Sequence, residues 1–188
     1  MNNFRRIISA YLPRNEFCNH KVNYCPSHRC KIPLDLLLAY LNSKFLDWYF
    51  RLGSSNNSVS HYQLYNLPIP LINAVISQDS HEHQNEKRQY QEASEAIVKG
   101  EFDAAFDALK PAMKTAPFSK ILADVLVDCV REIHRIEESR GTIDRSARSS
   151  LSAAAQPFQG FIDRLLFAMT GLTKEEAEGL EERLSRML

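Results

Sequence analysis

The chain has 188 residues, of which 44% are hydrophobic and 24% are charged, and its formal net charge is zero. This length suffices for one or two small domains, and zero net charge excludes a polybasic, histone-like protein. The charge is nevertheless uneven, because residues 1–72 hold 8 Lys and Arg against 3 Asp and Glu, while residues 73–188 hold 15 against 20. The first part is therefore suited to a polyanion and the second to a solvated scaffold.

Two further features of the sequence bear on location. No run of 18 apolar residues is present, and the N-terminal "MNNFRRIISAYLP" lacks the apolar core and cleavage site of a signal peptide. Three of the four cysteines lie close together beside two histidines, which fits a reducing compartment better than a disulfide scaffold. We therefore expect a cytoplasmic protein without membrane contact.

The first part of the chain mixes strand and helix patterns. Residues 4–30 contain short alternating or β-branched pieces cut by prolines, which predict strands and turns. Residues 33–52 predict one buried helix of about five turns, and Lys44, Asp47 and Arg51 share its remaining face. The apolar stripe of this helix is expected at Leu37, Leu41, Phe45, Trp48 and Leu52, widened by Leu34, Leu38 and Tyr49.

The alternation in "HYQLYNLPIPLI" predicts a short strand at Tyr62–Tyr65, ended by Pro68 and Pro70. Beyond it the patterns are helical, and we expect helices at 86–99, 101–114, 118–139, 144–155, 157–170 and 174–188. Gly171 is a stop signal, and "TKEE" at 173–176 is a capping box. The predicted fold class is thus α+β, with an N-terminal α/β recognition subdomain at 1–73, a polar linker at 74–86 and a helical domain at 87–188.

Signatures of catalysis are missing from the sequence. It contains no Gly-rich phosphate loop, no G-x-S-x-G and no H-E-x-x-H. We therefore expect no catalysis by this chain alone and no cofactor bound to it.

Two patterns have a functional and a simpler structural interpretation. Thiol and imidazole groups that zinc could bind lie in the spacing C-x-H-x4-C-x2-H-x-C, at Cys18, His20, Cys25, His28 and Cys30. This spacing matches no standard zinc finger, so ordinary thiols and turn residues are the favoured interpretation. The stretch at 90–117 has one tetratricopeptide-like pattern, and because such repeats need to stack, a plain helical hairpin is favoured there.

The loop that follows the buried helix is made almost wholly of hydrogen-bonding side chains. A solvated connection is the simpler interpretation, but such groups also pair with base edges and phosphates in DNA. The candidate DNA-binding residues are Lys21, Lys44, Arg51, Ser54, Ser55, Asn56, Asn57, Ser58, His61, Tyr62 and Gln63. Among them we expect Asn56, Asn57, His61 and Gln63 to contact base edges, and Arg51, Lys44, Lys21 and Ser54 to contact phosphates.

Two stretches resemble a known family. "LLLAYLNSKFLDWYFRLGSSNNSVSHYQLYNLPIP" at 36–70 resembles the TaqI-like C-terminal specificity domain of type IIG restriction-modification enzymes and related adenine-specific DNA methyltransferases. "FIDRLLFAMTGLTKEEAEGLE" at 161–181 is similar to the closing helix pair of the same domain, with Met169-Thr170 in place of the usual Leu-Tyr. Residues 74–120 are not covered by the resemblance and fit an insertion.

The resemblance implies a target-recognition module for double-stranded DNA. In the family a methyltransferase domain, which binds S-adenosylmethionine and carries an "NPPY"-type motif, precedes the specificity domain, often with an endonuclease domain before it. Neither the S-adenosylmethionine loop nor the catalytic motif occurs here. We therefore expect a methyltransferase or endonuclease domain or subunit as partner. The alternative prediction is a helical protein-interaction module built on the 90–117 hairpin.

Overall fold

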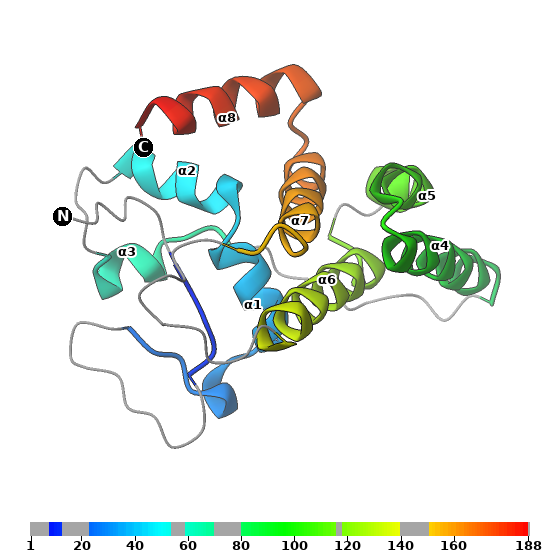
Figure 1. The fold of residues 1–188 in the computed structure, drawn as a ribbon, viewed down its shortest axis with the longest axis horizontal. Helices are drawn as coiled ribbons and strands as arrows, with labels where there is room; N and C mark the ends of the chain where they lie inside the picture. The colour runs from blue at the N-terminus through cyan, green and yellow to red at the C-terminus, as the bar shows by residue number, and fades with distance from the viewer. Residues whose placement is uncertain are drawn as a thin grey trace.

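A computed structural model of the chain describes residues 8–12, 23–53, 59–69, 80–115, 118–139 and 151–187 (Figure 1). In these residues the regular structure is helical and no β-strand occurs. The elements are η1 (Ser27–Arg29), α1 (Leu34–Leu41), α2 (Lys44–Gly53), α3 (His61–Tyr65), α4 (Ser80–Lys99), α5 (Phe102–Thr115), α6 (Lys120–Ser139), α7 (Gln156–Met169) and α8 (Lys174–Met187). The predicted α+β class with an N-terminal α/β subdomain is therefore wrong.

Helix α6 is the centre of the arrangement. It packs against α1 and α7 on one side, and the antiparallel hairpin of α4 and α5 covers its other end (Figure 1). Helix α8 follows α7 and packs against α2 (Figure 1). None of the helices in the described residues is both long and apolar enough to cross a membrane.

The largest core cluster joins residues from both halves of the chain. Its fully buried members include Leu36 and Tyr40 of α1, Leu109 of α5, Leu126 of α6 and Ile162 of α7. A smaller cluster packs Phe167 of α7 against Leu180 and Leu184 of α8. The boundaries predicted at 73 and 87 stay predictions, but this core contains residues from both sides of them.

The helix predicted at 33–52 is two helices, because the chain breaks at Asn42 and Ser43. The Ser43 hydroxyl donates to the Tyr40 carbonyl (2.7 Å) and accepts from the backbone N–H of Leu46 (3.1 Å), so it ends α1 and caps α2. The break changes which residues face inward. Leu36 and Leu46 are fully buried, whereas Leu52, placed in the predicted stripe, is exposed.

The strand predicted at Tyr62–Tyr65 is also wrong, because these residues form α3. Ser60 is its N-cap, and Gln63 completes a capping box in which each side chain binds the other residue's backbone N–H. The S-x-x-Q spacing at 60–63 is a local signal for this cap, whereas the alternation of aromatic residues favours a strand. Short aromatic runs are compatible with a strand or a helix, and here the capping box stabilises the helix.

The later helices agree better with the sequence patterns. The capping box at 173–176 is confirmed, since Thr173 and Glu176 bind each other's backbone N–H groups. Gly171 follows α7 with φ of +78°, a left-handed conformation that glycine adopts without strain. However, α4 already begins at Ser80, inside the predicted linker 74–86, and residues 151–155 of the predicted helix 144–155 are not α-helical. The rest of that predicted helix lies outside the described residues.

Replacing Ser43 by alanine should lower the free energy of unfolding by about 1 kcal/mol, because the Leu46 N–H would lose its cap in a buried position. The measurement is urea denaturation followed by circular dichroism. Ser185→Ala is the matched control, since Ser185 is an exposed α8 residue whose hydroxyl donates only to the Glu182 carbonyl. Equal effects of the two substitutions would contradict the assigned role of Ser43.

Candidate nucleic-acid interface

Helix α3 presents an aromatic side chain to solvent directly after the predicted recognition loop. The Tyr62 side chain is 78% exposed. The helix that carries it is capped at both ends by its own neighbours, since Ser60 and Gln63 cap its start and the Asn66 amide donates to the Tyr62 carbonyl (2.7 Å). On its core side, Leu64 packs against the main cluster. The tyrosine is therefore held on a short but fixed support.

Gln63 is already engaged in this support. Its side-chain oxygen accepts from the Ser60 N–H (2.9 Å) and from the Ser60 hydroxyl (3.0 Å). A bidentate contact with adenine needs both the oxygen and the NH₂ of a glutamine. Such a contact would open the capping box, so the geometry favours Gln63 as the residue that positions α3.

Arg51 lies in a largely buried ion pair. Its guanidinium donates to the Asp47 carboxylate, with Nε to Oδ2 at 3.2 Å. Asp47 is only 7% exposed, and a buried carboxylate needs a compensating cation. A DNA phosphate would have to compete with Asp47 for Arg51, which makes Arg51 less suited to the predicted phosphate contact.

Lys44 joins three helices at the start of α2. Its backbone N–H donates to Asp163 Oδ1 of α7 (2.8 Å), and its exposed side chain pairs with Glu181 of α8 (Nζ to Oε1, 2.7 Å). Gln159 extends the contact by donating to Asp163 and to the Asn42 carbonyl. The stretches 36–70 and 161–181, far apart in the sequence, therefore meet at Lys44.

Asp163 has an unusual environment for a carboxyl group, since only 2% of it is exposed. Burial raises its pKa to about 6, and the Glu181 carboxylate acts in the same direction. The Lys44 N–H, the Lys44 charge and the Gln159 amide oppose this rise by stabilising the ionised form. The junction is therefore sensitive to protonation of Asp163.

The turn around η1 carries cations that the sequence interpretation missed. Arg29 and Lys31 are exposed, and neither has an acidic partner among the described residues. Both belong to the stretch "HRCK" at 28–31, which also contains the candidate metal ligands His28 and Cys30. The Asn23 amide donates to the Val59 carbonyl (2.8 Å) and so ties the segment before η1 to the start of α3.

The remaining predicted contacts cannot be placed in this arrangement. Lys21, Ser54, Ser55, Asn56, Asn57 and Ser58 lie outside the described residues. His61 is the first residue of α3, and its side chain also falls outside the description.

The predicted zinc ligands are only partly described. Cys25 and His28 are exposed and Cys30 is half-buried, while Cys18 and His20 lie outside the described residues. Within the described part of the chain, no group of three side chains is arranged to hold a metal ion.

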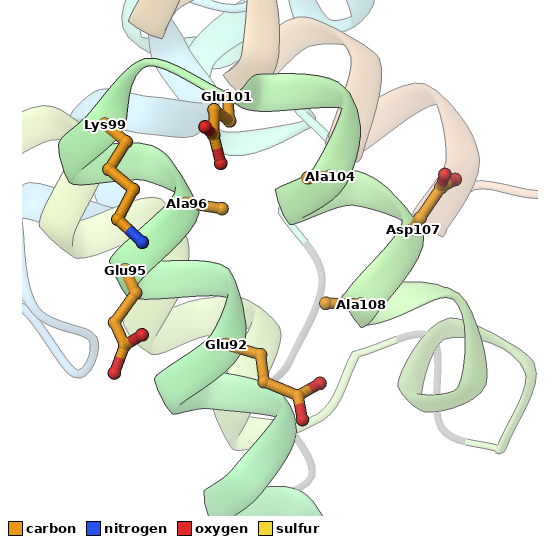
Figure 2. A pocket seen from close by; sticks show the side chains of 8 residues that line it. All are labelled: Glu92, Glu95, Ala96, Lys99, Glu101, Ala104, Asp107 and Ala108. Atoms are coloured by element: carbon orange, nitrogen blue, oxygen red, sulfur yellow. The ribbon is translucent and has the colours of Figure 1, made fainter.

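A second surface feature lies on the α4–α5 hairpin, where the two helices enclose an open groove of about 520 Å³. Figure 2 shows the methyl groups of Ala96, Ala104 and Ala108 directed into it. Its rim is mainly acidic and is formed by Glu92, Glu95, Lys99, Glu101 and Asp107. The hairpin itself agrees with the interpretation favoured for 90–117.

Comparison with protein-family models, with curated proteins and with solved structures found no match to this chain.

Replacing Asp163 by asparagine should remove a pH dependence of stability. The folded pKa of about 6 exceeds the reference value of 3.8, so the folded state binds the proton more tightly. Stability from this group is fully present below pH 3.8 and is lost as the pH rises to 6, by roughly 3 kcal/mol for a shift of this size. Asparagine can still accept from Lys44 without a buried charge.

Urea denaturation of both proteins at pH 4.5 and pH 7.5 measures this effect. The stability of the asparagine variant relative to the original chain should rise between the two pH values. Asp103→Asn is the matched control, because Asp103 is exposed and pairs with Arg164 at the surface. A relative stability that stays constant with pH would show that Asp163 does not titrate in this range.

Proposed function

We propose that this chain is a DNA target-recognition module of a type II restriction-modification or adenine-specific DNA methyltransferase system. It acts in the cytoplasm, reads double-stranded DNA and performs no catalysis alone. The observation that carries the proposal is the meeting of the two resembling stretches at Lys44, Asp163 and Glu181.

This contact supports the resemblance because the residues involved belong to the stretches that suggested it. Lys44 is the lysine of "LNSK", and Asp163 is the aspartate of "FID". A structural unit of α1, α2, α7 and α8 that this chain shares with the family would explain why both stretches resemble the family in sequence. The stretch outside the resemblance supplies α4 and α5, which pack on α6 beside this unit.

The module would meet DNA with the surface around α3. The loop 54–58 leads directly to Ser60 and α3, so Asn56 and Asn57 are the proposed base readers, and the exposed Tyr62 adds an aromatic contact. Arg29 and Lys31 are the cations best suited to phosphates, since Arg51 and Lys44 each have an acidic partner. Gln63 and Ser60 would hold α3 in place.

Few cations are available, so binding by this chain should be modest and dependent on salt. A partner that binds another face of the duplex would supply the remaining affinity. In the proposed system this partner is a methyltransferase domain or subunit, and S-adenosylmethionine would bind there.

The first test measures binding to random-sequence duplex DNA by fluorescence anisotropy across a series of salt concentrations. Arg29→Gln combined with Lys31→Gln should lower the slope of log affinity against log salt by about 2, because each phosphate contact releases about one counterion. Lys99→Gln combined with Lys114→Gln on the hairpin is the control that removes the same charge. Equal slopes for both double variants would refute the proposed face.

A selection from a random duplex library tests base reading. Asn57→Ala should relax the selected sequence at one position, at a cost of about 1–3 kcal/mol for the preferred base, while overall salt dependence is retained. The control is Ser60→Ala, which weakens the α3 cap without removing a proposed base contact. If Asn57→Ala leaves the selected sequence unchanged, Asn57 is not a base reader.

The groove on the hairpin favours a second candidate function, a protein-interaction module for basic helical segments. Its alanine floor permits close approach of a helix, and its acidic rim complements lysine and arginine. Glu95 and Glu101 have no ionic partner among the described residues, whereas Glu92 pairs with Arg88 and Asp107 with Lys110.

A lysine-rich amphipathic helical peptide probes this candidate by isothermal titration calorimetry. Glu95→Gln combined with Glu101→Gln should weaken binding several-fold, because two rim charges are lost. The control pair is Glu175→Gln with Glu178→Gln, both exposed on α8. Binding that is absent, or equally weakened by both pairs, would reject the groove as the binding site.

A further inference from the structure

Helix α3 carries two tyrosines on one face. Tyr62 and Tyr65 are 78% and 85% exposed, and their i, i+3 spacing makes them neighbours on the helix surface. Another face of α3 is turned inward, because Leu64 packs against the main core cluster. Two large aromatic side chains are thus held next to each other in solvent, on a helix that the core keeps in place.

A third exposed tyrosine lies close to this helix. Tyr24 is 74% exposed, and it directly follows Asn23, whose amide donates to the Val59 carbonyl (2.8 Å). Since consecutive Cα atoms are only about 3.8 Å apart, one residue on one side of this hydrogen bond and three on the other keep Tyr24 near Tyr62. The exposed aromatic side chains therefore come from two segments that meet in space.

The two stretches that carry these tyrosines contain no acidic residue. Neither 17–34 nor 48–78 has an aspartate or a glutamate, and the hydrogen bond from Asn23 to Val59 joins them. Arg29 and Lys31 are exposed in the first stretch, and neither has an acidic partner among the described residues. A polyanion is therefore attracted to a surface that also presents aromatic rings.

Aromatic rings beside unpaired cations fit a single-stranded nucleic acid. Every unpaired base offers a flat face on which a tyrosine stacks, while its phosphates attract the cations. In a duplex these faces are covered by the neighbouring bases, so the grooves present only base edges and phosphates. The other side chains along α3 are the polar Ser60, Gln63 and Asn66, so the patch lacks the apolar centre of a protein interface.

We propose that Tyr62 and Tyr65, with Tyr24 beside them, form a stacking surface for unpaired bases of single-stranded DNA, and that Arg29 and Lys31 contact the phosphates of the same strand. The inference extends the proposed function, because recognition of a duplex needs no contact with the face of a base. It rests on that function only for the choice of DNA as the strand.

The cations are within reach of a strand that contacts the rings. Arg29 lies six residues after Asn23, and a fully extended chain of six residues spans no more than about 20 Å. Asn23 contacts the segment that leads into α3. A strand of several nucleotides, which is the usual size of a single-strand site, therefore spans both groups of side chains.

Fluorescence anisotropy of the full chain with a labelled thymidine strand of about 12 nucleotides measures this binding. The control ligand is a strand of equal length that has the phosphates but no bases. The thymidine strand should bind about tenfold more tightly than the abasic strand, because only stacking separates the two. A uridine strand of the same length should bind no more tightly than the thymidine strand.

Variants of the tyrosines separate stacking from charge. Tyr62→Ala combined with Tyr65→Ala should weaken binding of the thymidine strand about tenfold and leave the abasic strand unaffected. Tyr62→Phe combined with Tyr65→Phe should retain the binding, since the rings remain. Tyr49→Ala is the matched control, because Tyr49 is an exposed tyrosine of α2. Circular dichroism of each variant checks that its helices are retained.

Photochemical cross-linking locates the strand on the original chain without any substitution. A strand that contains bromodeoxyuridine should attach to tryptic peptide 52–87, which contains both tyrosines of α3, and to peptide 22–29, which contains Tyr24. Peptide 45–51 is the internal control, since it contains Trp48 and Tyr49. Attachment to the control peptide alone would contradict the proposed surface.

The proposal is also overturned by absent binding of the thymidine strand, by equal binding of the abasic strand, or by a double alanine variant that binds as the original chain does. Tighter binding of the uridine strand would refute DNA as the ligand. Duplex binding that persists alongside any of these results leaves the proposed function standing. Tyrosine-dependent binding of the thymidine strand without duplex binding would instead refute duplex recognition alone.

Discussion

The position of α2 depends on a hydrogen bond between its first backbone N–H and a buried carboxyl group on another helix. The N–H of Lys44 has no partner within α2, as is true of every helix start, and Asp163 accepts it at 2.8 Å. A negative charge at this point is favoured by the partial positive charge of the helix end. That attraction offsets part of the cost of burying Asp163, and in return α2 is fixed to α7.

The neighbours of Lys44 extend this connection to other parts of the molecule. The Asn42 side chain binds both the N–H and the carbonyl of Ser9, at 2.8 and 2.9 Å, and so holds the N-terminal segment across the α1–α2 break. Ser43 ends one helix and caps the next, and the Lys44 side chain reaches Glu181 on α8. Asn42, Ser43 and Lys44 therefore connect α2 to the N-terminal segment and to α1, α7 and α8. These contacts give the "LNSK" stretch a structural role.

The contrast between correct and wrong predictions has a physical origin. In α6, Leu122, Val125, Leu126 and Cys129 recur at helical spacing and are fully buried, because a long amphipathic pattern leaves only one favourable orientation. The α1–α2 break gave no such signal, since it depends on Ser43 and on Asp163, which lies 119 residues after Lys44. For α3, a local capping box outweighed the alternation that suggested a strand. The candidate site shows the same division, because the helical pattern places Asp47 on the face of Arg51, whereas no local pattern indicates that Glu181 lies beside Lys44.

Asp47 and Glu181 neutralise part of the positive charge that the sequence assigns to residues 1–72. Residues 1–72 carry a surplus of cations by count, yet Lys44 is matched by Glu181 of α8 and Arg51 by Asp47. In the opposite sense, Arg131 of α6 pairs with Asp35 of α1. The exposed pairs of Lys44 and Arg131 add little stability, so their main effect is on the field that a ligand meets, whereas Arg51 compensates the buried charge of Asp47. In residues 23–53, the cations without a carboxylate partner are Arg29 and Lys31. Within this part of the chain, an anion such as a phosphate therefore meets unpaired positive charge at the η1 turn and not at Lys44 or Arg51.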